Sequence, residues 1–136
     1  LLSVDVPVWE RWLQRHADNY HTIDYDVRVG TPRDPGPDID QPTRDLAINL
    51  SYRRIDAVAY AESHTTCIEI TTRAGLTAIG QAATYPVLLR QSYNIDGPIH
   101  SLIVCAEMDP DIQAAARAHN IQYAILPDET TPSEPI

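Results

Sequence analysis

The chain of 136 residues contains no lysine and no phenylalanine, and it has only one methionine and two cysteines. All ten basic residues are therefore arginine, and against 19 acidic residues they leave a net charge of −9. An acidic chain has no general electrostatic attraction for nucleic acid, because that affinity comes largely from neutralising phosphates. Any contact with DNA would need a local cluster of arginines.

Long hydrophobic runs are also missing, since no segment approaches the roughly 20 apolar residues of a membrane span. The first ten residues include an acidic residue and a proline, where a signal peptide has a basic start and an apolar run. Cys67 and Cys105 lie in apolar segments and form neither a disulfide framework nor a zinc site. We therefore expect a protein of the reducing cytoplasm that is neither secreted nor membrane-spanning. Because the chain begins at Leu1 and its one methionine is Met108, we expect the natural start to be trimmed or absent.

The hydrophobic pattern predicts one domain over residues 1–127 and a flexible tail at 128–136. Apolar residues at helical spacing predict helices over residues 8–17, 76–92 and 109–120. Alternating or continuous apolar runs predict strands over residues 19–29, 53–60, 66–71, 99–106 and 121–126. This order predicts an α/β protein with a mixed (α+β) sheet: a helix, a three-strand meander, then helix, strand, helix and strand, with helices on both faces.

The segment 30–45 holds four prolines, two glycines and four aspartates, so we expect a long loop without helix or ladder. After this loop, we expect residues 46–51 to be extended chain that leads into the strand over residues 53–60. The spacing of Asp34, Asp38 and Asp40 lacks the ligand order and closing glutamate of an EF-hand. A solvated acidic loop and a metal site both stay open for this segment.

The side chains of two predicted helices divide into core and surface candidates. Trp9 and Trp12 are expected in the core rather than as a platform for stacked bases. In the helix over 76–92, one apolar stripe is formed by Leu76, Ile79, Ala83 and Val87. Pro86 predicts a kink or two consecutive helical pieces. Gln81 and Tyr85 lie off this stripe, where they either contact a substrate or pack on the helix surface.

Two acidic residues, Asp56 and Glu69, lie on consecutive strands of the meander. Alternation predicts one face of the first strand with Ile55, Ala57 and Ala59, and the other with Arg54, Asp56, Val58 and Tyr60. On the next strand, Cys67, Glu69, Thr71 and Arg73 share a face. A hairpin that joins the two acidic faces brings the carboxylates together, and one would stay protonated unless a cation sat between them. Mg²⁺ or Mn²⁺ suits such oxygen ligands; a structural pair held by arginine and backbone is the alternative.

A strand aspartate, a Glu-X-Lys motif on the next strand and a glutamine on the following helix are the signature of the PD-(D/E)XK nuclease-like superfamily. The chain resembles this superfamily over nearly its whole length, and the resemblance implies a restriction-endonuclease-like core. Asp56 matches the motif aspartate, Glu69 the motif acid and Gln81 the helix glutamine. The resemblance also implies the carbonyl of Ile70 as a metal ligand beside the two acids.

Thr71 occupies the position of the motif lysine, which in the family positions the attacking water and stabilises charge at phosphorus. Threonine has no charge to offer, so we expect Arg73 or Arg54 to supply it. Arginine would restore the charge but not a proton-accepting base. Glu10, on the first helix, resembles an extra acidic residue that some members place there.

Two functions follow from the resemblance. The first is a Mg²⁺- or Mn²⁺-dependent endo- or exodeoxyribonuclease, with DNA as its partner. Its implied catalytic residues are Asp56, Glu69, Thr71, Arg73 and Gln81. The second is an inactive nuclease-like module that serves as a structural subunit, for example in a phage head or neck, with protein partners or as a homo-oligomer within a virion. Thr71 and the net charge favour the second function, whereas the retained acid pair favours the first.

Overall fold

The computed structural model describes residues 1–128, so the predicted tail at 128–136 lies, apart from Asp128, outside the described residues. The helices are α1 (Val6–His16), α2 (Gln41–Ser51), α3 (Leu76–Ser92) and α4 (Pro110–Ala118), with 3-10 turns at Ser3–Asp5 and Ala17–Asn19. The strands are β1 (Thr22–Val29), β2 (Arg53–Tyr60), β3 (Thr65–Ala74), β4 (Ile99–Met108) and β5 (Gln122–Ile125). Within the described residues, no helix has the length and apolar character needed to cross a membrane.

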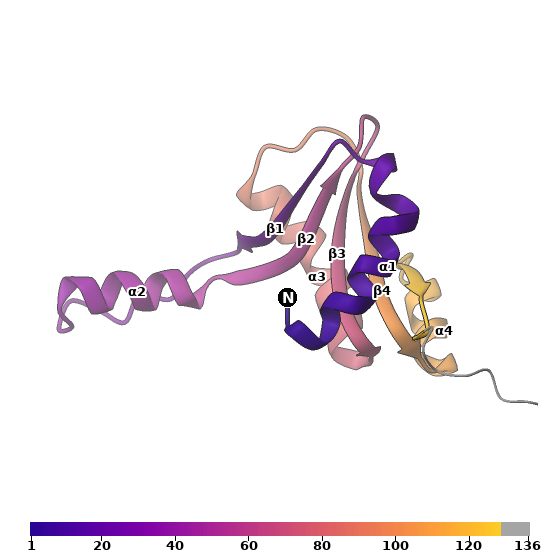
Figure 1. Ribbon diagram of the computed structural model, residues 1–136. Helices are drawn as coiled ribbons and strands as arrows, with labels where there is room; N and C mark the ends of the chain where they lie inside the picture. Colours follow the sequence, from indigo (N-terminus) through magenta and orange to yellow (C-terminus); the bar gives the residue numbers. More distant parts are fainter. Residues whose placement is uncertain (129–136) are drawn as a thin grey trace, which may run out of the picture.

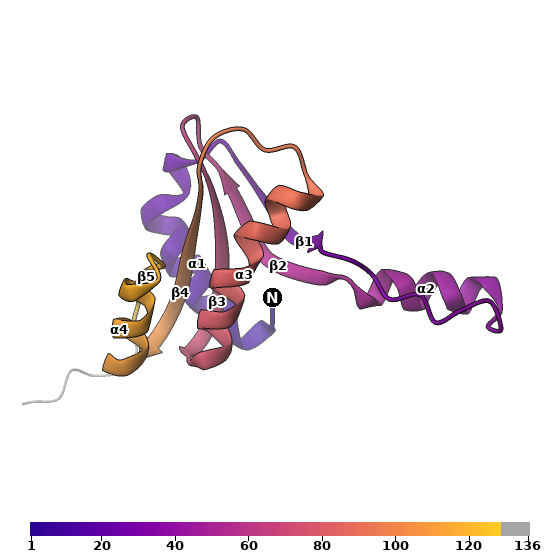
Figure 2. The same cartoon turned by 180° about the vertical axis from the view of Figure 1, so that it is seen from behind.

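The five strands form one mixed sheet in sequence order, β1-β2-β3-β4-β5. The first three pair antiparallel as a meander, and β3, β4 and β5 pair parallel through the crossover helices α3 and α4. α1 covers one face of the sheet, and α3 and α4 cover the other (Figures 1 and 2). The predicted α/β fold class, with the topology of a restriction-endonuclease-like core, is therefore confirmed.

The core under α1 is built on its two tryptophans, as the sequence predicts. Trp9 and Trp12 are 3% and 2% exposed, and their rings stack with centroids 4.9 Å apart. They pack on small and aliphatic side chains of the central strands, including Ala57, Ile68 and Val104. Burying such large rings contributes several kcal/mol each at roughly 25 cal/mol per Å² of apolar surface, which fixes α1 on this face.

The apolar stripe predicted for α3 is wrong, because Leu76 is 79% exposed and Val87 is 56% exposed. The helix instead buries the side chains of Ala78, Ala82, Tyr85 and Leu89. α3 is apolar on most sides, so hydrophobicity alone does not select the buried stripe. The side with the alanines faces the sheet because these small side chains allow the helix to approach it closely. At the closest point, Ser101 Oγ donates to the carbonyl oxygen of Ala82 at 2.6 Å. α3 also continues through Pro86 as one helix instead of splitting in two.

The prediction of loop and extended chain is wrong at residues 41–51, which form helix α2. Asp40 caps this helix by accepting the backbone N–H of Thr43, and Pro42 suits its first turn because no N–H is needed there. Asp34 in turn accepts two hydrogen bonds from Arg44, which lower the pKa of Asp34. Two of the three loop aspartates thus stabilise the local structure.

α2 projects from the body of the protein at the end of the extended β1 and β2 strands (Figures 1 and 2). None of its residues is buried, and Leu46 and Leu50 are 57% and 64% exposed. We call residues 30–52 the arm. An isolated helix of this length is marginal in water, so the polar contacts at its base matter for its position.

Candidate functional site

The central feature of the site is the place where β2 and β3 stop pairing. Their backbone ladder runs from Tyr60 opposite Thr65 to Ala57 opposite Ile68. At the next position, Asp56 Oδ2 accepts the backbone N–H of Ile70 at 2.9 Å. A carboxylate therefore replaces a strand carbonyl as the partner of this N–H, and it is fixed between the two strands.

Glu69 completes an acid pair with Asp56. It is 5% exposed, and its Oε1 atom is buried without a hydrogen-bond partner among the described residues. Burial first, and the nearby Asp56 carboxyl second, raise the pKa of Glu69 to about 9. This raised pKa favours the neutral form of Glu69, because burial disfavours the charged form and two neighbouring carboxylates repel each other.

The acid pair suits a hard divalent cation. Two carboxyl groups, one of them with an unpaired buried oxygen, are donors that Mg²⁺ and Mn²⁺ accept, and such ions keep several water ligands. The described part of the chain holds no group of three or more His, Cys, Asp or Glu side chains that could bind a metal. Further ligands would come from water or from backbone oxygens such as the carbonyl of Ile70.

Gln81 and Tyr85 of α3 lie beside the acid pair. Tyr85 is 7% exposed, on the buried side of α3, so its predicted place off the packing stripe is wrong. Burial and the Glu69 carboxyl raise the pKa of Tyr85, while a hydrogen bond from Gln81 opposes this shift. The structure thus brings Asp56, Glu69, Gln81 and Tyr85 together from two strands and one helix.

The alternation predicted for β2 breaks at Asp56. Ile55 packs with Val58 and Leu89 on the α3 side of the sheet, whereas Ala57 and Ala59 pack on the α1 side. The predicted grouping of Ile55 with the two alanines is therefore wrong. Asp26, opposite this point on β1, has φ of 54°, a conformation that aspartate tolerates better than most residues.

Because of this break, Arg53 lies on the α3 side, a placement that strict alternation misses. It pairs in register with the buried Val29, and its charge opposes the rise in the pKa of Tyr85. Arg53, Gln81 and Tyr85 line a hollow of about 450 Å³. In the sequence, the only sign of this break in alternation is Asp26, which lies opposite Asp56 on β1. A prediction from strict period-two alternation does not use it.

The two arginines predicted to replace the motif lysine have other contacts. Arg54 pairs with Asp26 at 2.8 Å and donates to the carbonyl of Asn49, so it points toward the arm. Arg73 is 80% exposed and pairs with Glu107 on β4 at 3.0 Å. The structure therefore brings neither arginine to the acid pair.

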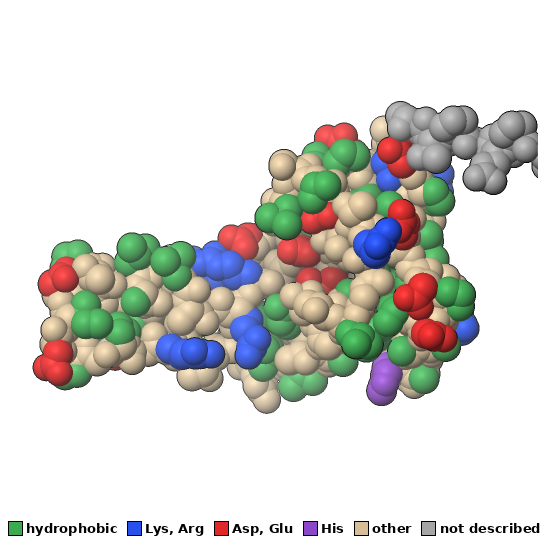
Figure 3. Space-filling model, turned by 90° about the horizontal axis from the view of Figure 1, so that it is seen from below, with side chains coloured by type: hydrophobic (Ala, Val, Ile, Leu, Met, Phe, Trp, Pro, Cys, Tyr) green, Lys and Arg blue, Asp and Glu red, His purple; other side chains and the backbone are tan. Residues whose placement is uncertain are grey.

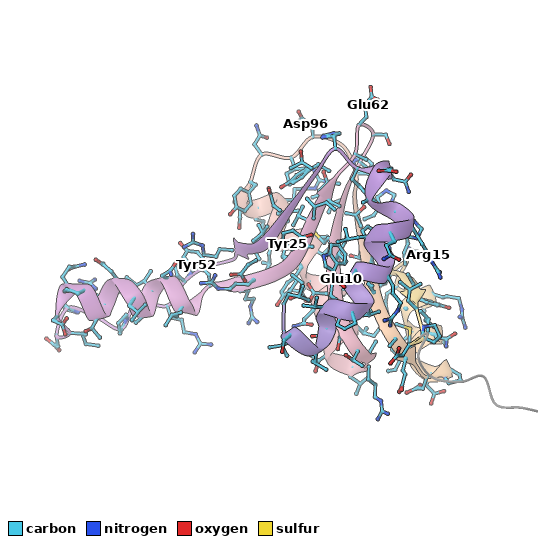
Figure 4. The ribbon with its side chains drawn as sticks, viewed as in Figure 1. Glu10, Arg15, Tyr25, Tyr52, Glu62 and Asp96 are labelled. Atoms are coloured by element: carbon cyan, nitrogen blue, oxygen red, sulfur yellow. The ribbon has the colours of Figure 1, made fainter. Side chains whose placement is uncertain are left out.

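Two further predicted positions lie at the margin of the site. Thr71 follows Glu69 on the same side of β3, and its Oγ1 donates to the carbonyl of Arg73 at 3.3 Å. Glu10 is exposed on α1, which covers the opposite face of the sheet (Figure 4). The weak resemblance at Glu10 thus has no counterpart in the geometry of the site.

No protein-family profile and no curated protein matches the chain. Among solved structures, the chain is similar to EndoMS in its apo form, with 10% sequence identity and a TM-score of 0.48. The similarity covers 93% of this chain and 47% of the EndoMS chain, so it spans about half of the longer protein. The fold assignment accordingly rests on the element order and sheet topology described above.

Proposed function

We propose that the protein is a metal-dependent nuclease that hydrolyses phosphodiester bonds in DNA. The observation that carries this proposal is the buried acid pair, in which Glu69 Oε1 has no partner among the described residues. An unpaired buried carboxyl oxygen costs folding free energy, and such groups are retained where they serve binding or catalysis.

Asp56, Glu69 and the Ile70 carbonyl would hold the ion. A bound Mg²⁺ or Mn²⁺ supplies positive charge for the scissile phosphate and lowers the pKa of a bound water. The bond from the Ile70 N–H fixes the Asp56 carboxylate in place, so this ligand is oriented before any ion arrives. A carboxylate fixed in this way loses little conformational entropy on binding.

Arg53 supplies part of the positive charge that Thr71 lacks. Its side chain is exposed at the hollow that Gln81 and Tyr85 line, and the structure gives it no carboxylate partner among the described residues. Arginine stays protonated and binds phosphate with its planar fork of donors. Arg53 therefore stabilises negative charge on a phosphate, while Gln81 orients Tyr85 at the entrance.

The test is Mn²⁺ binding by calorimetry together with cleavage of plasmid and single-stranded DNA. Glu69→Gln should abolish both, because the amide keeps the size of the side chain but cannot ionise. Glu62→Gln is the matched control, since Glu62 lies exposed in the β2–β3 turn (Figure 4). Absence of cleavage by the natural protein across metals and DNA forms would contradict the proposal.

A second candidate function is an inactive module that binds another protein. Thr71 in place of a lysine favours it, and so does the arm, which exposes Leu46 and Leu50 to solvent. This candidate predicts a stable protein complex whose assembly is unchanged by Glu69→Gln. Co-purification followed by mass spectrometry of the natural and variant proteins distinguishes the two functions.

A further inference from the structure

The acidity of the chain is distributed unevenly. Residues 28–54, which form the arm and the strand ends that carry it, hold five of the ten arginines but only four of the 19 acidic residues. Their net charge is +1, and the rest of the chain carries −10. Most of the protein therefore repels a polyanion, and the electrostatic repulsion is weakest at the base of the arm.

Three of these arginines are available for a ligand. Arg44 and Arg54 form ion pairs with aspartates, whereas Arg28, Arg33 and Arg53 are exposed and have no carboxylate partner within residues 1–128. The side chain of Arg28 donates to the neutral Asn49. Its charge is thus not compensated by this contact.

The same three arginines surround the base of the arm. Arg28 pairs with Arg54 and Arg53 pairs with Val29 at successive positions of the β1–β2 ladder, so the side chains of Arg28 and Arg53 leave its two opposite faces. The backbone N–H of Arg33 donates to Ser51 Oγ at 2.6 Å, which places residue 33 at the same end of the arm. Basic side chains gather over the junction between the arm and the body, beside a recess that contains acidic side chains (Figure 3). We call Arg28, Arg33 and Arg53 the basic junction.

Two hollows lie along α3, one beside Arg28 and the other beside Arg53. One, of about 570 Å³, is lined by Arg28, Tyr52 and Tyr93 among others, and the second is the hollow of Arg53, Gln81 and Tyr85. Leu88 of α3 lines both, so the two hollows are neighbours, and together we call them the groove. The groove leads from the arm to Tyr85, which lies next to the acid pair.

We propose that the basic junction binds the phosphate backbone of a nucleic acid and directs it along α3 to the acid pair. The regularly spaced phosphates of a nucleic acid can contact arginines that are spread along a groove. Tyr52 and Tyr93 line the same groove, and their rings can stack on unpaired bases. The chemistry at the end of the groove rests on the proposed nuclease function. Binding at the basic junction does not rest on the nuclease function, because it needs neither a metal ion nor catalytic turnover.

The test measures binding to a short labelled DNA by fluorescence anisotropy in EDTA, over a range of salt concentrations. Single-stranded and double-stranded forms are compared. Each substitution Arg28→Gln, Arg33→Gln or Arg53→Gln should reduce the slope of log affinity against log salt by about 0.7–0.9, and the triple variant by about two or more. Urea unfolding of each variant checks that the fold is kept.

Arg117→Gln is the matched control. Arg117 is exposed on α4 and donates to the Tyr123 hydroxyl, so the substitution removes the same charge elsewhere on the molecule. Its salt slope should equal that of the natural protein. Equal slopes for the basic-junction variants and Arg117→Gln would overturn the proposal, even if the protein cleaves DNA.

The remaining outcomes separate this proposal from the nuclease function. Binding that depends on the basic junction, without cleavage by any metal, supports the groove and contradicts the nuclease. A dimer that Leu46→Glu dissociates, combined with no DNA binding that depends on the three arginines, would instead assign the arm to a second copy of the chain and overturn the proposal. Sedimentation velocity with and without DNA detects that dimer.

Discussion

Asp56 on β2 accepts the backbone N–H of Ile70 on β3 at 2.9 Å, at the point where the two strands stop pairing. One carboxylate thus satisfies a buried donor of the sheet and stands next to the buried Glu69. Asp56 therefore has two roles: it accepts a hydrogen bond within the sheet, and it is a candidate metal ligand. Substitutions that keep the first role and remove the second can separate them.

Asp56→Ala should destabilise the protein, because it leaves the Ile70 N–H without its acceptor. The expected loss is about 1–3 kcal/mol in the free energy of unfolding. Asp56→Asn keeps an oxygen acceptor and should retain most of the stability, yet it should still lose Mn²⁺ binding. Urea denaturation and calorimetry on both variants check this. Equal stability of the alanine variant and the natural protein would show that the bond does not support the sheet.

Glu69 makes stability depend on pH. Its pKa rises from 4.5 in the unfolded chain to about 9 in the folded protein, so the neutral form favours folding. The stabilisation is complete below pH 4.5 and is lost as the pH rises toward about 9, with a slope of about 1.4 kcal/mol per pH unit. Glu69→Gln should flatten this decline, as measured by urea unfolding across that range without metal. A natural protein that becomes more stable over this range would contradict the assignment.

Metal binding should release a proton, because a protonated Glu69 must ionise to act as a ligand. With a pKa of about 9 in the metal-free protein, Mn²⁺ affinity should increase with pH through neutrality and level off near pH 9. Calorimetry at one pH in buffers of different ionisation enthalpy counts the protons released. The expected value near neutrality is about one per ion. No proton release would place the ion elsewhere.

The arm gives a test that involves no chemistry at the acid pair. Asp40 caps α2, and its replacement by alanine should cost about 0.5–2 kcal/mol of helix stability. Because α2 contributes no buried residue, hydrogen exchange should show faster opening of α2, with the global free energy of unfolding almost unchanged. Asp38→Ala, two residues earlier in the exposed loop, is the control. A global loss of stability would mean that α2 packs on the body.

The fold was predictable because its core elements carry strong local patterns. The tryptophans of α1, the apolar run of β4 and the capped start of α4 each specify one element and its buried side. α2 was missed because prolines and aspartates suggest a loop, although Pro42 and Asp40 are also the residues that begin a helix. Composition alone does not distinguish these two uses.

The acid pair was predictable, but the charge beside it was not. Asp56 and Glu69 meet where β2 and β3 stop pairing, and burial, together with the nearby Asp56 carboxyl, raises the pKa of Glu69. The place of Arg53 beside Tyr85 was not predicted, because alternation assumes a regular strand, and β2 is irregular at Asp56. Tyr85 was misplaced for a related reason: several stripes of α3 are apolar, and only contact with the sheet selects one of them.

Thr71→Lys tests whether the site is a nuclease site that has lost one charge. Thr71 is half-buried and two residues beyond Glu69, so a lysine there places an ammonium group beside the acid pair. Restoring one such electrostatic group should raise the cleavage rate by about 10²–10³ if Asp56 and Glu69 bind metal as proposed. Thr71→Met, similar in length but uncharged, should give no increase, and neither should Thr71→Lys combined with Glu69→Gln. An equal rate for the lysine and methionine variants would mean that charge at residue 71 is not what limits the reaction, because Arg53 already supplies it or because the site does not act on phosphodiesters.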